Sequence, residues 1–186
     1  MCGIPRNTYD LITGNDCVLL VIDVQERLIP VISEKEKIVE NVIRLLKFAK
    51  IVDIPVVLTE QIKLGNTILD VQKEASDTKA IGKAHFNCFF CDEFVDKIKQ
   101  IDRKTLVIAG VESHICVAQT AIYALPDFNV HIISDAVSSR TSENRHIALE
   151  RMKQAGAVIS STEMFIYEIL QKAGTDAFKA TLQLVK

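Results

Sequence analysis

Cys116 is the residue of this chain whose type and position best suit nucleophilic chemistry. It follows an apolar run over 105–109, Gly110 and a short polar segment, and it precedes a pattern of helical periodicity. This arrangement predicts that the thiol lies where a strand passes into a helix. The amino end of a helix carries about half a positive charge and unpaired N–H donors, and both favour a thiolate over a thiol. The sequence therefore predicts an activated nucleophile at this position, with ordinary core packing of a buried cysteine as the alternative.

Two further residues have types that would complete such a site. Asp23 ends an apolar run that begins at Cys17, and Lys83 follows Gly82 after a short predicted strand. A nucleophilic cysteine needs a base to take its proton and a cation to hold the resulting charge. The spacing leaves two other roles open, because Asp23 could cap a turn and Lys83 could lie on the surface.

Apolar runs that predict strands alternate with segments of helical periodicity along the chain. The predicted strands are 17–23, 55–59, 78–82, 104–109, 129–134 and 157–160, and the predicted helices are 34–52, 92–100, 116–125, 142–154, 163–172 and 176–185. This alternation predicts α/β architecture: a three-layer α/β/α sandwich around a mostly parallel, doubly wound sheet of about six strands. Ligands of such sheets bind beyond the carboxyl ends of the strands, where Asp23 and Cys116 are expected.

Composition narrows the class of protein. The 186 residues fit one domain, which we expect to span 1–186. A net charge of −2 without a basic block argues against nucleic acid, and no apolar run approaches the length of a membrane span. No glycine-rich nucleotide-binding loop is present, so no cofactor is predicted. The absence of a secretion signal and the odd number of cysteines predict reduced thiols and a cytoplasmic protein. The five cysteines are Cys2, Cys17, Cys88, Cys91 and Cys116.

From Cys17 to about Lys179 the sequence resembles the isochorismatase-like cysteine hydrolase superfamily, and it is most similar to the isochorismatase domain-containing proteins of eukaryotes. Six short segments carry the resemblance, in the family's order: Val21-Ile-Asp-Val-Gln25, Thr59-Glu-Gln61, Lys83-Ala-His-Phe86, Ala109-Gly-Val-Glu-Ser-His-Ile-Cys-Val117, Asp135-Ala-Val-Ser-Ser-Arg140 and Ala155-Gly-Ala-Val158. Each segment alone is a weak signal, whereas six in order are a specific one.

The resemblance implies a role for each member of the predicted site. Asp23 would be the general base, Lys83 the charge-stabilising partner and Cys116 the nucleophile. A cis peptide bond between Val111 and Glu112 would aim the backbone N–H groups of Glu112 and Cys116 at a developing oxyanion. The resemblance also implies substrate contacts from Gln25, Gln61, Phe86 and Glu112.

Two departures from family patterns narrow the chemistry. The nicotinamidase branch carries an Asp-x-His metal motif after the second strand, whereas this chain has Thr59-Glu-Gln-Ile-Lys63 there, so neither a metal nor nicotinamide is expected. True isochorismatases lack the cysteine that is present here. The resemblance therefore favours a metal-independent cysteine hydrolase that acts on a small amide, carbamoyl or related carbonyl substrate through an acyl-thioester.

Two other functions stay open at this stage: a catalytically inactive fold that serves as an interaction protein, and a protein that acts on nucleic acid. His85, Cys88 and Cys91, spaced by threes, suit zinc binding or redox chemistry less well than packing. His114 is expected to orient the segment before Cys116 or to face solvent, and residues 138–140 to hold a loop at a strand end. His131 and His146 are expected at ordinary sheet or surface positions.

A homo-oligomer, at least a dimer, is also predicted. The resemblance implies it, and apolar positions beyond the capacity of one small core would favour it: Phe89, Phe90, Phe94 and Phe165.

Overall fold

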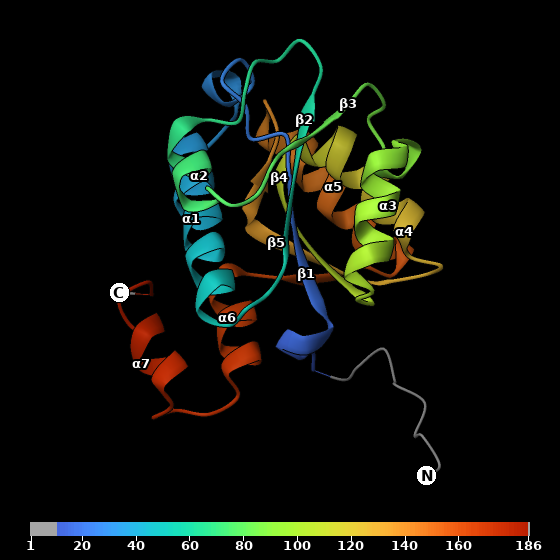
Figure 1. The fold of residues 1–186 in the computed structure, drawn as a ribbon. Helices are drawn as coiled ribbons and strands as arrows, with labels where there is room; N and C mark the ends of the chain where they lie inside the picture. Colours follow the sequence, from blue (N-terminus) through green and yellow to red (C-terminus); the bar gives the residue numbers. More distant parts are fainter. Residues whose placement is uncertain (1–10, 186) are drawn as a thin grey trace.

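The computed structural model describes residues 11–185, in which six strands form one sheet with helices on both faces (Figure 1). The strands are β1 (Cys17–Ile22), β2 (Val56–Gln61), β3 (Ile81–Lys83), β4 (Thr105–Val111), β5 (Asn129–Ser138) and β6 (Val158–Ser160). The α-helices are α1 (Lys35–Ile51), α2 (Leu69–Glu74), α3 (Asp92–Ile101), α4 (Ala118–Ala124), α5 (Ser142–Ala155), α6 (Thr162–Leu170) and α7 (Asp176–Thr181). Short turns are η1 (Gly14–Asp16), η2 (Ile29–Val31), η3 (Cys88–Phe90) and the π-helical η4 (Ser113–Val117). Cys2 lies outside the described residues.

The sheet has the strand order β3-β2-β1-β4-β5-β6, and every neighbouring pair is parallel. The chain builds one half of the sheet outward from β1, then returns to the other side of β1 to add β4. The strand order therefore reverses between β1 and β4, which is where ligands bind in doubly wound sheets. The predicted fold class is confirmed.

The sheet is buried on both faces. In β1, Cys17, Leu19 and Val21 pack toward α1 and α6, whereas Val18, Leu20 and Ile22 pack toward α3, α4 and α5. Figure 1 shows the same division, with α1, α2, α6 and α7 on one side of the sheet and α3, α4 and α5 on the other. A continuous apolar run is what such a doubly covered strand requires.

All predicted strands and helices are present, although several bounds differ: β5 runs four residues further, to Ser138, and α7 ends at Thr181. The strand expected over 78–82 is β3, at 81–83, and the helical segment expected from Cys116 begins at Ser113. Helix α2 was not predicted, because six residues with no capping side chain give little periodic signal. No helix in the described part of the chain is long and apolar enough to cross a membrane.

Gly110 allows β4 to approach β1 closely at the site. Its φ is +111°, and a Cβ atom there would lie 2.1 Å from the Ile22 carbonyl oxygen. A side chain at this position would therefore push apart the two strands that carry Asp23 and Cys116.

Of the four phenylalanines that were expected to exceed the capacity of one core, two are buried in it. Phe94 and Phe165 are fully buried, so both have places in the core. Phe165 packs edge-to-face on Phe48, with ring centroids 5.8 Å apart. Phe89 is half-buried and Phe90 is exposed, so only these two remain as surface candidates.

Candidate active site

Asp23 lies directly after β1, with its backbone in the left-handed region at φ +53°. Its N–H donates to the Thr59 carbonyl at 3.1 Å, and its carbonyl accepts from the Gln25 N–H at 2.9 Å. Left-handed backbone is uncommon outside glycine, but aspartate tolerates it better than most residues. This turn lies at the end of a fully buried strand, so the carboxylate is buried at the carboxyl edge of the sheet.

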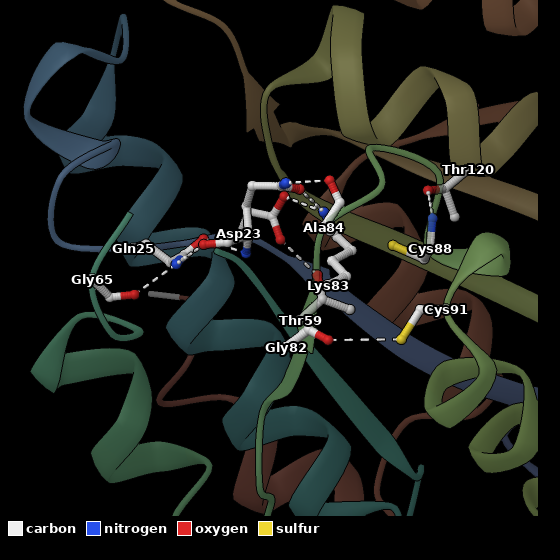
Figure 2. A network of polar contacts seen from close by, with 11 residues as sticks. Asp23, Gln25, Thr59, Gly65, Gly82, Lys83, Ala84, Cys88, Cys91 and Thr120 are labelled. Carbon is white, nitrogen blue, oxygen red and sulfur yellow. Dashed lines mark hydrogen bonds and ion pairs between the residues drawn. The ribbon is translucent and has the colours of Figure 1, made fainter. Parts of the chain in front are cut away.

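Lys83 and Asp23 form a fully buried ion pair (Figure 2). The lysine ends β3 and reaches past β2, so that its Nζ lies 2.7 Å from Asp23 Oδ2 and 2.8 Å from Gln61 Oε1. Burial by itself lowers the pKa of Lys83. The Asp23 carboxylate, with smaller contributions from Cys116 and Cys88 and a hydrogen bond to Asp23, outweighs burial and raises it. Lys83 is therefore a cation at neutral pH.

The second Asp23 oxygen is held by a residue to which no role was assigned from the sequence. The Thr59 hydroxyl donates to Asp23 Oδ1 at 2.8 Å. Thr59 lies on β2, whose carboxyl end neighbours that of β1, and this adjacency was the only signal that could have indicated the contact.

Cys116 lies in η4, buried beside the Asp23–Lys83 pair. Burial raises its pKa above the ordinary value, and the Asp23 charge and a side-chain hydrogen bond with Asp23 raise it further, against the opposing effect of Lys83. The helical segment begins three residues before the cysteine. Burial and the Asp23 charge act against the thiolate that a helix end would favour. The residue is a neutral thiol that is hydrogen-bonded to a carboxylate.

The peptide bond between Val111 and Glu112 is cis. The Glu112 carbonyl accepts from the N–H groups of Ile115 and Val117, at 3.1 and 3.2 Å. Its carboxylate accepts from the Arg140 backbone N–H at 2.9 Å and from Arg140 Nε at 3.2 Å. Glu112 therefore ties the cysteine-bearing turn to the loop after β5.

That loop is held from two more sides. His114 Nδ1 lies 2.9 Å from Ser139 Oγ, and Ser138 Oγ donates to the Ser33 carbonyl at 2.8 Å. His114 therefore connects the cysteine-bearing turn to Ser139, and Ser138 connects the end of β5 to the segment before α1.

The residues expected to contact substrate differ in exposure. Gln25 is fully buried, and its amide is bonded to the backbone of Gln61 and Gly65. It therefore holds the loop after β2 instead of facing a ligand. Gln61 bonds Lys83 and the Ala84 carbonyl, and Phe86 is exposed beyond β3, so these two retain a route to a ligand.

His85, Cys88 and Cys91 are not gathered around one point. The exposed His85 ring packs edge-to-face on Phe90, Cys88 is buried with its N–H on Thr120, and Cys91 Sγ contacts the Gly82 carbonyl. Within residues 11–185 no three His, Cys, Asp or Glu side chains are grouped to hold a metal ion. His131 is a buried sheet residue whose pKa is lowered by burial, and His146 is exposed on α5.

The fold and the site together define a class: doubly wound α/β proteins with a thiol, a carboxylate and an ammonium at the edge where the strand order reverses. The Isochorismatase domain matches residues 17–164, and the chain belongs to the isochorismatase family.

Among sequence relatives, the chain is 36% identical over 176 residues to the secreted isochorismatase effector Isc1 of Phytophthora sojae, covering 91% of this chain and 84% of the relative. It is 33% identical over 189 residues to isochorismatase domain-containing protein 2 of Danio rerio, covering 100% and 92%. The predicted likeness to eukaryotic members of the family is confirmed.

Among solved structures, the MAR1 ribonuclease of Caenorhabditis elegans superposes with a TM-score of 0.88 at 31% identity, over 95% of this chain and 92% of that one. The YcaC gene product of Escherichia coli, described as an octameric hydrolase of unknown specificity, superposes with a TM-score of 0.87 at 27% identity, over 94% and 92%.

Proposed function

We propose that the protein is a metal-independent cysteine hydrolase of small amide, carbamoyl or related carbonyl compounds. The observation that supports this proposal most directly is that one buried carboxylate, Asp23, contacts both the Lys83 ammonium and the Cys116 thiol. A thiol with a raised pKa is a poor nucleophile unless a base takes its proton as the bond forms. Asp23 is in a position to act as that base.

The first half-reaction uses Asp23 twice. Its carboxylate takes the Cys116 proton while the sulfur attacks the substrate carbonyl carbon, and the tetrahedral oxyanion accepts from the backbone N–H groups of Glu112 and Cys116. The protonated Asp23 then donates to the leaving amine as the carbon–nitrogen bond breaks. An acyl-thioester on Cys116 remains.

In the second half-reaction, water replaces the thiol as the nucleophile, and the same steps of proton transfer and attack follow. Asp23 takes a proton from a water molecule that attacks the thioester, and collapse of the second tetrahedral intermediate returns the proton to Cys116. Lys83 stays protonated throughout, and its charge stabilises the carboxylate whenever Asp23 is ionised.

The charges around the thiol favour an uncharged substrate. Asp23 and Lys83 compensate each other, and Glu112 is paired with Arg140. Binding a charged group beside two already neutral pairs would require a new counter-charge. Neutral amides and imides therefore fit the site better than carboxylate-bearing compounds.

The donor set supports a metal-independent reaction. The segment at the end of β2, Gln61-Ile-Lys63, offers no histidine or carboxylate, and Glu60 accepts from the N–H and hydroxyl of Thr67. Chelation followed by elemental analysis tests this, and a stoichiometric metal that restores activity on re-addition would contradict it.

Mass spectrometry of the full-length protein after incubation with a library of small amides tests the hydrolase. We expect a covalent adduct on Cys116 that is absent in Cys116→Ala and nearly absent in Asp23→Asn. General base catalysis contributes on the order of 10²–10⁴-fold, so Asp23→Asn should lower turnover of an identified substrate at least about a hundredfold. A loss below about tenfold would indicate a structural aspartate, and a library without any adduct would favour the inactive interaction protein.

A nuclease is the second candidate, because the name of the C. elegans relative describes a ribonuclease. The net charge of −2 offers little attraction for phosphates. Cleavage of labelled RNA at about physiological salt, with Cys116→Ala as control, separates the two candidates. Cleavage that this substitution abolishes would replace the proposed substrate class.

We further propose one hydrolase domain over residues 1–186 that forms a homo-oligomer in the cytoplasm. The octameric E. coli relative supports association. The described residues contain four free cysteines, which suits a reducing compartment, although the P. sojae relative is named as secreted. Cell fractionation with a tagged chain tests the location.

A further inference from the structure

The hydrogen bond from Thr59 is the Asp23 contact that the proposed mechanism leaves without a role. Thr59 stands opposite Ile22 in the parallel pairing of β1 and β2, one residue before Asp23. Its carbonyl accepts from the Asp23 N–H at 3.1 Å, and its hydroxyl donates to Asp23 Oδ1 at 2.8 Å. Both residues are almost completely buried, so no bulk water competes for these groups.

Two donors on different oxygens fix the plane of the carboxylate. Lys83 holds Oδ2 from β3, and Thr59 holds Oδ1 from β2 (Figure 2). The last torsion of an aspartate side chain has a broad energy minimum, so a single donor would leave the carboxylate free to rotate. With both donors in place, its orientation toward Cys116 is set before a substrate arrives.

Asp23 sets the direction of the Thr59 hydroxyl. A carboxylate only accepts, so the single hydroxyl hydrogen of Thr59 points to Asp23 Oδ1. The Cys88 thiol lies near the hydroxyls of Thr59 and Thr120, and the Cys88 N–H donates to Thr120 Oγ1 at 3.0 Å. Burial raises the pKa of Cys88 to about 11, so the thiol still carries its proton at neutral pH.

We propose that Thr59 is a positioning residue, whose hydroxyl fixes the orientation of the Asp23 carboxylate toward Cys116. This inference rests on the proposed function, in which Asp23 is the base. The titratable groups that face Asp23 are Lys83 from β3, Cys116 from η4 and Cys88 from η3, and of these only the lysine carries a charge in the resting site. Loss of the hydroxyl leaves the carboxylate with Lys83 as its one strong donor.

The test is the rate at which iodoacetamide alkylates Cys116 in the full-length protein at neutral pH, followed by peptide mass spectrometry. In Thr59→Val, which keeps the shape of the side chain, we expect this rate to fall at least about tenfold, because the carboxylate can then rotate away from the thiol. Thr59→Ser keeps the hydroxyl and should restore the wild-type rate.

Asp23→Asn separates failure of this inference from failure of the proposed function. An alkylation rate that is unchanged in Asp23→Asn would mean that Asp23 is not the base. A rate that falls in Asp23→Asn but not in Thr59→Val would overturn the role of Thr59 alone, and so would a Thr59→Ser rate as low as that of Thr59→Val. Thermal melting identifies a Thr59→Val protein that does not fold, and Thr59→Ala then takes its place with the same expected loss of rate. A purely structural threonine would lower the melting temperature without slowing the alkylation.

Discussion

At the scale of single residues, the site contains two charged side chains that are shielded from solvent. Asp23 and Lys83 have fully buried side chains, and each is the main counter-charge of the other. A buried ion pair contributes little net stability, but the loss of one partner leaves an uncompensated charge. The pair therefore makes the fold depend on the same residues as the proposed chemistry.

Lys83→Met should lower the free energy of unfolding by about 3–5 kcal/mol, because it leaves the Asp23 carboxylate buried without its cation. Urea denaturation at neutral pH measures the loss. The double variant Asp23→Asn/Lys83→Met removes both charges and should recover most of it. A single variant within about 1 kcal/mol of the wild type would show that solvent reaches the carboxylate.

At the scale of elements, the site depends on how closely β4 approaches β1. Gly110 faces the Ile22 backbone at a distance that no side chain permits, and the strands it joins end in Asp23 and the cis peptide. A contact between two strands therefore sets the position of the Cys116 thiol relative to the Asp23 carboxylate. This contact lies one residue before Asp23 and one residue before the cis peptide bond begins.

Gly110→Ala should destabilise the protein by at least about 3 kcal/mol, because a Cβ would meet backbone atoms that cannot move aside and φ is positive. Gly82→Ala is the matched control: it lies on β3 with ordinary φ and no atom within 4 Å of the added Cβ. Thermal and urea unfolding compare the two. Equal stability of both variants would mean that β1 and β4 can separate without cost.

At the scale of the whole molecule, buried thiols make stability depend on alkaline pH. Burial, with a smaller contribution from Asp16, raises the pKa of Cys17 from 9.0 to about 12, and Cys88 is shifted in the same direction. Above pH 9 the unfolded chain has lost these protons while the native protein keeps them. Stability is therefore complete below pH 9 and declines as pH rises toward the native pKa values.

Cys17→Ala should flatten this decline, by at most about 1.4 kcal/mol per pH unit, because one thiol no longer takes part. Urea denaturation at a series of alkaline pH values gives the slope. The smaller alanine side chain lowers the free energy of unfolding by the same amount at every pH, so it does not affect the slope. Parallel slopes for the variant and the wild type would contradict the burial of this thiol.

An exposed aromatic pair is the surface feature that best suits the proposed association. Phe90 and Tyr123 are 56% and 51% exposed, and their rings stack edge-to-face with centroids 5.2 Å apart. Phe89 packs against Tyr123 and against the buried Phe94, so it connects the pair to the core. Exposed aromatic clusters of this kind mark interaction sites.

Light scattering at micromolar concentration should give a mass of at least twice 20.7 kDa for the wild type. Phe90→Ser with Tyr123→Ser should shift the protein toward monomer, because both side chains lose their apolar contacts. Leu69→Ser, at an exposed position on α2 on the other side of the sheet, is the control and should leave the mass unchanged. A wild type with the mass of one chain would rule out the oligomer.

The sequence by itself determined the alternation of strands and helices, and with it the doubly wound sheet. Doubly buried strands such as Cys17–Ile22 are apolar at every position, and this local property is visible in the chain. The same logic brought Asp23 and Cys116 to one edge, because both follow buried parallel strands. The sequence also offered Lys83 as a candidate after a short strand, but the family resemblance alone gave it a role, because the neighbour of β3 in the sheet cannot be predicted locally.

Tertiary structure alone decided the state of the site. Thr59 and Cys88 join the Asp23 network because β2 and η3 pack beside β1 and α4, a result of pairing between segments far apart in sequence. Gln25, which suits ligand binding by type, is fully engaged by the backbone of the next loop. The helix end predicted a thiolate at Cys116, but a pKa depends on the solvation and charges contributed by every neighbouring element. Burial and Asp23 therefore decide that the resting group is a thiol.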